Sequence, residues 1–240
     1  MTTLNELQDR VDEINKLIEE KIKSKDNPNI FPITDGIIDI NKYYNAKYKI
    51  LWILKEPYDG FDDDGMPSGG DWDLCDVIRK KQTIYDFIGG RRTFKPMIYT
   101  SWSILNDFCL WDYMDNVEDN PTMLEAFKSI AYINIKKLPG YTSSSSSVIK
   151  NAYQLYKDIL LKQIDYYNPD IVIGGSTLDY FFNDLGFKGE EMQKHESVYY
   201  IVKDNKIFIK AYHPSQRSST TEVTQEKYCD DIITTIKLFF

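Results

Sequence analysis

Short apolar runs bounded by polar residues recur along the chain. Residues 48–54 (YKILWIL) and 129–137 (SIAYINIKK) have the continuous apolar character of strands buried in a parallel sheet. Residues 168–176 (NPDIVIGGS) predict a third buried strand that ends in two glycines and a serine. Residues 197–212 (SVYYIVKDNKIFIKAY) predict two strands around a Lys-Asp-Asn turn.

Helical periodicity fills several of the intervals between these strands. Residues 3–24 repeat apolar side chains at helical spacing and predict an amphipathic packing helix. The same spacing predicts helices over residues 149–166, 177–186 and 221–239. Strands and helices therefore alternate along the chain.

This alternation predicts an α/β fold. We expect one domain over residues 1–240, in which residues 1–25 form an N-terminal packing helix. The predicted architecture is a three-layer α/β/α sandwich with a central, mostly parallel sheet of four to five strands. In such sheets, sites form where the carboxyl ends of strands open into loops. Four strand ends qualify: LKEPYDG, INIKKLPG, IGGST and YHPSQRSS.

The net charge of −8 argues against a protein that coats nucleic acid non-specifically. A local basic face can still grip DNA on an acidic protein. The candidate residues for such a face are Arg79, Lys80, Lys81, Arg91 and Arg92, and a solvated surface is the alternative reading.

The positions of the cysteines and the lengths of the apolar runs limit the kinds of metal site and the cellular locations that the sequence allows. Cys75, Cys109 and Cys229 are too scattered for a CxxC zinc site or for a four-cysteine iron–sulfur cluster within one chain. No run approaches the roughly 18 apolar residues of a membrane span, and the acidic, helical start does not resemble a signal peptide. We expect a cytoplasmic monomer without a membrane partner, cofactor or metal.

Each polar residue at a strand end also has an ordinary structural explanation. Glu56 can be a surface carboxylate, Asn134 an amide that satisfies nearby backbone, and Ser176 a helix N-cap. His213 is one of only two histidines, and an isolated histidine is often a satisfied core residue.

The order of the four strand ends resembles that of the uracil-DNA glycosylase superfamily. That family has a strand ending in an acid-Pro-Tyr motif, a strand carrying Asn, a strand ending in Gly-Ser and a later His-Pro-Ser motif. Here the first motif is LKEPYDG and the last is HPSQRSS, and the resemblance covers roughly residues 48–220. It implies the family's fold and an activity on DNA.

The resemblance also implies roles for single residues. It makes Glu56 the carboxylate that positions water, Tyr58 the wall of the base pocket and Asn134 the amide that reads the base edge. Ser176 becomes a phosphate contact, which a following helix would favour through its dipole.

The His-Pro-Ser motif supplies the remaining roles. By resemblance, His213 stabilises the departing base, Ser215 contacts a phosphate and Arg217 wedges into the duplex. Trp72 is our choice for the aromatic that stacks on the base, with Phe61 second.

These roles together predict a DNA glycosylase that hydrolyses the N-glycosidic bond of a flipped base and leaves an abasic site. The partner is DNA, duplex or single-stranded. The base is uracil or a modified pyrimidine, such as hydroxymethylcytosine or its glucosylated form in phage DNA. Repair and anti-phage defence both fit.

The acidic segment 59–73 (DGFDDDGMPSGGDWD) bears on the choice of base. Its carboxylates can point into solvent, or they can line an enlarged pocket and accept hydrogen bonds from a hydroxyl-bearing base. A tyrosine at position 58 that walls the pocket would argue for a smaller base. The six acids lack the spacing of a calcium loop.

Departures from the family pattern leave alternatives open. Leu54, Lys55 and Gln216 stand where the family has Gly, Gln and Pro, and the acid is Glu rather than Asp. Lys55 would permit a Schiff-base lyase route. A catalytically silent module that binds DNA or a protein partner is the second hypothesis, and a small-molecule N-glycosidase is the third.

Overall fold

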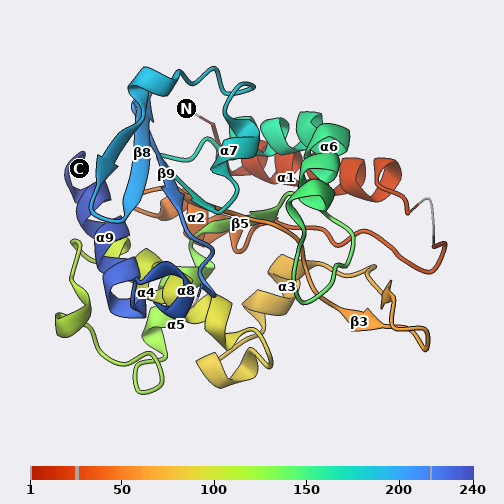
Figure 1. The fold of residues 1–240 in the computed structure, drawn as a ribbon, viewed down its shortest axis with the longest axis horizontal. Helices are drawn as coiled ribbons and strands as arrows, with labels where there is room; N and C mark the ends of the chain where they lie inside the picture. Colours follow the sequence, from red (N-terminus) through yellow and green to blue (C-terminus); the bar gives the residue numbers. More distant parts are fainter. Residues whose placement is uncertain (1, 25–26, 217) are drawn as a thin grey trace.

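The computed structural model describes residues 2–24, 27–216 and 218–240 (Figure 1). Its centre is a seven-stranded mixed sheet in the order β1-β5-β2-β6-β9-β8-β7. The strands are β1 (Gly36–Ile37), β2 (Ile50–Leu54), β5 (Ala131–Asn134), β6 (Ile171–Gly175), β7 (Gln193–His195), β8 (Val198–Lys203) and β9 (Lys206–Ala211). A separate hairpin consists of β3 (Gly60–Phe61) and β4 (Pro67–Ser68).

The four middle strands β5, β2, β6 and β9 are mutually parallel, and β1, β8 and β7 add antiparallel edges. The predicted α/β class and parallel core are confirmed. The predicted count of four to five strands is too low, because β1 and β7 span only two and three residues. Strands this short leave no periodic pattern in a sequence.

Helices cover both faces of the sheet (Figure 1). One layer consists of α3 (Leu74–Arg79), α4 (Arg91–Leu105), α5 (Thr122–Lys128) and α9 (Gln225–Lys237). The other consists of α6 (Ser146–Tyr167), α1 (Leu4–Lys21), which packs on α6, and α7 (Leu178–Phe181). Shorter elements are α2 (Ile40–Asn45), α8 (Ser218–Thr221) and the 3-10 turns η1 (Ile84–Asp86), η2 (Trp111–Tyr113) and η3 (Gly189–Glu191).

Alternation along the buried strands holds the layers together. Trp52 and Leu54 of β2 face the α4 layer, whereas Leu51 and Ile53 face the α6 layer. The fully buried indole of Trp52 donates to Ser101 Oγ of α4 at 3.1 Å. Each such large apolar side chain contributes about 1.5–3 kcal/mol when it is buried. Strand β2 is therefore anchored on both faces, which fixes the loop that follows it.

The chain path creates a switch point in the sheet. It leaves β2 through α3, α4 and α5 to reach β5 on one side, and it returns through α6 to reach β6 on the other side. Crevices in open α/β sheets form at the carboxyl ends of strands where the order reverses in this way. Here that place lies at the ends of β2 and β6.

Other predicted elements are confirmed or shortened. The helices predicted over 3–24 and 149–166 are α1 and α6, and the β8–β9 turn has Asp204 and Asn205 at positive φ, as a tight hairpin requires. The helix predicted over 177–186 is wrong in length, because α7 has four residues before the chain turns. Within the described parts of the chain, no helix has the length and apolar character needed to cross a membrane.

Candidate active site

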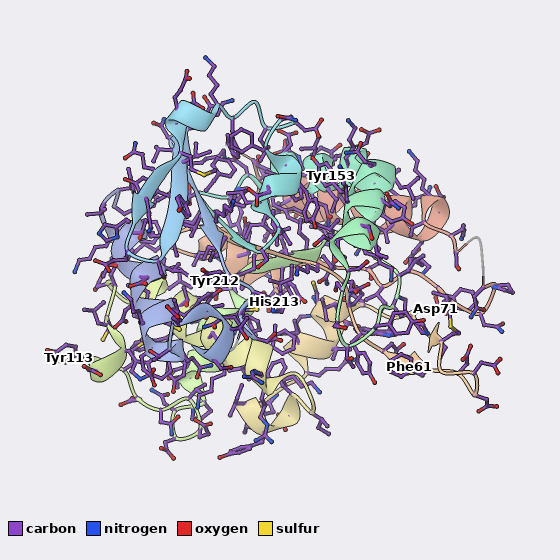
Figure 2. All side chains as sticks on the ribbon, in the orientation of Figure 1. Phe61, Asp71, Tyr113, Tyr153, Tyr212 and His213 are labelled. Carbon is purple, nitrogen blue, oxygen red and sulfur yellow. The ribbon has the colours of Figure 1, made fainter. Side chains whose placement is uncertain are left out.

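The four predicted strand ends lie side by side at one edge of the sheet. Leu54 of β2 pairs with Asn134 of β5, and Gly175 of β6 pairs with Ala211 of β9. Neighbouring strands are about 5 Å apart. The loops that carry Glu56 and His213 therefore leave the same edge, two strand positions apart. Figure 2 shows His213 near the middle of the molecule.

Gly175 lets three strand ends pack in direct contact. A β-carbon at this position would lie 2.5 Å from Leu54 Cδ2 and 3.0 Å from Pro214 Cδ. The neighbours are the buried side chain of Leu54 and a proline ring, so they have little freedom to move away. Glycine at 175 thus fixes the loop after β9, and with it His213, against the end of β2.

His213 is set up as a neutral hydrogen-bond donor. Its Nδ1 lies 2.8 Å from Ser215 Oγ and accepts from the Ser215 backbone N–H at 3.2 Å. Burial, assisted by the positive charge of Lys55, lowers the pKa of His213 from 6.5 to about 4. The ring is therefore neutral near pH 7. Because Nδ1 accepts a hydrogen bond, the proton is on Nε2.

Glu56 is held by the loop that follows β5. Its side chain is only 5% exposed, and Oε2 accepts from Lys136 Nζ at 2.8 Å. Lys136 also donates to the carbonyl of Pro139 at 2.9 Å. A β-carbon at Gly140 would lie 2.0 Å from Glu56 Oε2, so only glycine leaves room for the carboxylate there.

Asn134 is completely buried and carries an unpaired donor. Its Oδ1 accepts from the Tyr132 hydroxyl at 3.2 Å, whereas Nδ2 has no hydrogen-bond partner among the described residues. An unsatisfied buried polar group costs about 1–3 kcal/mol, so each one calls for an explanation. A base acceptor would satisfy Nδ2, but only after the side chains that cover Asn134 move.

A buried charged network supports Asn134 from behind. Its backbone N–H donates to Asp35 Oδ2 at 2.8 Å. The other carboxylate oxygen of Asp35 accepts from Lys137 Nζ and, at 3.1 Å, from Gln163 Nε2. Lys137 and Gln163 have no exposed surface. Burial lowers the pKa of Lys137, and the negative charge of Asp35 opposes that shift.

The aromatic candidates divide into two groups. Tyr58 is 53% exposed and meets Phe61 edge-to-face at 5.7 Å between ring centroids, and Phe61 lies 5.9 Å from Tyr141. Trp72 is partly buried against the core and donates its indole N–H to Asp59 Oδ2 at 2.9 Å. Tyr58 and Phe61 thus share an exposed aromatic cluster with Tyr141, and Trp72 is not one of its ring contacts.

The acidic segment forms the β3–β4 hairpin and the residues that follow it, and Figure 2 places Phe61 and Asp71 at the edge of the molecule. Asp62 accepts from the backbone of its own turn, and Asp73 caps α3 and accepts from the Thr34 hydroxyl at 2.8 Å. Asp59 already accepts from the Trp72 indole. Asp62, Asp63, Asp64 and Asp71 are exposed, which supports the solvent-facing reading for these four, whereas Asp59 and Asp73 are partly buried. Across the described ranges, no group of three or more His, Cys, Asp or Glu side chains suits a metal ion.

The residues predicted to contact phosphate differ in their exposure and in the hydrogen bonds that they already form. Ser176 is exposed at φ 59°, and its N–H donates to the Ala211 carbonyl at 2.9 Å. With that N–H occupied and α7 only four residues long, the expected contribution of a helix dipole falls away. Ser215 bonds to His213. Arg217 lies outside the described residues.

Several residues of this edge were not anticipated from the sequence. Lys136 and Gly140 fix Glu56, and Asp35 accepts from the backbone N–H of Asn134. Lys55 was considered only for a lyase route, and its positive charge near His213 was not anticipated. The KKLPG segment after β5 was the one available signal, because a strand end rich in lysine and glycine lies beside a predicted carboxylate.

Comparisons with known proteins give no family. No protein-family model matches the sequence, and no curated protein matches it. The resemblance to the uracil-DNA glycosylase superfamily therefore stays a prediction that rests on the motifs.

Proposed function

We propose that the protein is a DNA glycosylase, with a uracil-DNA glycosylase-like fold, that hydrolyses the N-glycosidic bond of a flipped non-canonical base. The observation that carries this proposal is the placement of the His213 imidazole and the buried Glu56 carboxylate at the same edge of the sheet. Nδ1 of His213 accepts from the Ser215 backbone N–H, which leaves Nε2 as the donor of the neutral ring. Cleavage of an N-glycosidic bond needs both groups, because negative charge builds on the base and positive charge on the sugar.

The proposed reaction assigns one task to each group. The bond between the sugar C1′ and the base nitrogen breaks with its electron pair on the base, whose carbonyl accepts a hydrogen bond from His213 Nε2. The carboxylate of Glu56 stabilises the sugar cation and orients the water that adds to C1′. The proton released by that water neutralises the base. Lys136 holds Oε2 of Glu56, and Oε1 accepts no hydrogen bond from the described residues.

The unpaired amide of Asn134 supports recognition of the base. A pyrimidine that enters the site offers a carbonyl to Nδ2, which has no partner among the described residues. Uracil and a modified pyrimidine both satisfy this requirement. The acidic hairpin adds no specific support for a sugar-bearing base, because Asp59, Asp62 and Asp73 already accept hydrogen bonds from the protein.

The test uses purified protein on end-labelled DNAs that contain uracil, hydroxymethylcytosine or glucosylated hydroxymethylcytosine. Alkali then cuts the DNA at any abasic site. We expect excision of one base, and loss of that excision in Glu56→Gln and in His213→Ala. Excision that survives both substitutions would refute the assigned roles.

A catalytically silent DNA-binding module is the second candidate, and one observation favours it. Glu56 is paired with Lys136 and almost fully buried, while Asn134 is sealed from solvent. Retained DNA binding without excision of any of the three bases would select this alternative.

A further inference from the structure

A cavity of about 450 Å³ lies beside the proposed active site. It is bounded by the start of α4 and by the loop that follows His213, with Pro214 and Gln216 in its wall. Gln216 is fixed there, because its N–H donates to the His213 carbonyl at 2.8 Å and its amide donates to the Val223 carbonyl at 3.0 Å. One wall of the cavity is therefore continuous with the loop that presents the catalytic imidazole.

The opposite wall carries positive charge. Arg91, Arg92 and Lys95 line it, together with one acidic residue, Glu118. Lys95 and Glu118 neutralise each other through contacts of 2.9 and 3.1 Å. Within the described parts of the chain, neither Arg91 nor Arg92 forms an ion pair, and the Arg91 guanidinium lies 5.5 Å from the Tyr85 ring centroid. The cavity is left with two uncompensated guanidinium groups.

These two arginines differ from Arg79 and Lys80, two other members of the predicted basic face. Arg79 and Lys80 both form ion pairs with Asp76, so this carboxylate partly compensates their positive charges. Arg91 and Arg92 occupy the first turn of α4, which contains no acidic residue and whose N-cap, Gly90, makes no side-chain cap. Cations are unfavourable beside the positive end of a helix, so an anion between them would relieve this cost.

We propose that this Arg91–Arg92 cavity binds a backbone phosphate of the DNA strand whose base is presented to His213. The inference rests on the proposed function, since it assigns part of the DNA to the wall next to the active site. Guanidinium groups bind phosphate through paired hydrogen bonds. A cleft lined by one sign of charge also concentrates ions of the opposite sign, which offsets the net charge of −8 locally.

The test compares DNA binding of wild type and Arg91→Gln/Arg92→Gln by fluorescence anisotropy with short labelled duplex and single-stranded DNA over a range of salt concentrations. A lost phosphate contact should lower the slope of log affinity against log salt by about 1. It should also lower affinity roughly tenfold at about 0.1 M salt. The matched control is Lys16→Gln/Lys150→Gln, which removes the same charge from exposed positions on α1 and α6 in the opposite layer.

The inference holds if the arginine variant loses affinity and slope while the control binds as wild type and both keep the wild-type thermal midpoint. Equal losses in the two variants would show a bulk charge effect and overturn it. Inorganic phosphate forms the second arm. If phosphate raises the thermal midpoint of wild type but not of the arginine variant, while DNA affinity is the same in both, a free anion fills the cavity and the DNA assignment is wrong.

The outcome separates this inference from the proposed function. Excision by wild type, together with unchanged binding and excision by the arginine variant, overturns the cavity assignment alone. Arginine-dependent DNA binding without excision of any base overturns the glycosylase alone.

Discussion

Asn134 allows a test in which stability and activity change in opposite directions. Its amide is fully buried, and Nδ2 lacks a partner in the described structure, whereas Oδ1 accepts from the Tyr132 hydroxyl at 3.2 Å. The variant Tyr132→Phe/Asn134→Leu removes the donor and the acceptor of that bond together with the unpaired N–H groups. No polar side-chain atom of the pair then remains buried without a partner.

The magnitude follows from the groups removed. Loss of the Tyr132–Asn134 hydrogen bond costs about 0.5–1.5 kcal/mol, and removal of the unsatisfied Nδ2 returns about 1–3 kcal/mol. We therefore expect the free energy of unfolding of the double variant to equal that of the wild type or to exceed it by about 1 kcal/mol. For a chain of this length, that corresponds to a rise in Tm of about 2–4 °C. Excision should be lost, because the amide that reads the base is gone.

The assay is urea unfolding followed by tryptophan fluorescence and circular dichroism, alongside the excision assay. The matched control is Gln163→Met, which also removes a fully buried amide, but one that bonds to Lys137, Asp35 and the Tyr167 hydroxyl. The free energy of unfolding of the control should fall by about 2–5 kcal/mol, since the substitution removes one hydrogen bond from each of the buried charged groups of Lys137 and Asp35. A double variant as destabilised as the control would show that Asn134 is an ordinary structural amide.

Three further outcomes follow from the same contacts. Lys137→Met should lower the free energy of unfolding in urea by about 3–5 kcal/mol, because it leaves the buried carboxylate of Asp35 without its cation. Adding Asp35→Asn should restore part of that loss, whereas strictly additive losses would contradict the pairing. His213 should stay neutral in NMR titrations until the pH approaches its pKa of about 4. The pKa of His213 in the unfolded chain is near 6.5, so its neutral ring contributes fully to stability above pH 6.5, and this contribution is lost as the pH falls towards 4. Titration of His213 near pH 6.5 in the folded protein would refute the lowered pKa. Gly140→Ala should displace the Glu56 carboxylate and abolish excision, and full activity would show that the close approach is unimportant.

The sequence revealed the sheet core because its strands are continuous apolar runs. β2, β5, β6, β8 and β9 all lie within the predicted segments. No helix or strand was predicted over residues 74–128, although they contain the helices α3, α4 and α5. The reason is visible in α4, which contains Pro96 and buries the polar side chains Thr100, Ser101 and Ser103, so that its buried face is not apolar in the sequence.

In the candidate site, the residues at strand ends could be predicted from the sequence, whereas the residues that contact them could not. That Glu56, Asn134 and His213 share an edge follows from parallel strands alone, because such strands end on the same side of the sheet. Their partners do not follow. Asp35 precedes the first strand of the parallel core, and Gly140 lies in a loop, so each meets its partner only through the packing of the whole chain.

The charged residues around Glu56 and His213 give this edge of the sheet a local charge that differs from the net charge of the chain. Lys136 compensates Glu56, so the carboxylate adds little repulsion against a departing anionic base. Burial, with a smaller contribution from the positive charge of Lys55, lowers the pKa of His213 and keeps its ring neutral, so that Nε2 is the donor while Nδ1 accepts from the Ser215 backbone. Under the proposed function, the base would leave towards the N–H donor of His213 and towards Lys55, which forms no ion pair with the residues that the structure describes. The net charge of −8 is therefore no obstacle to anion stabilisation, since charges at contact distance outweigh screened charges elsewhere on the surface.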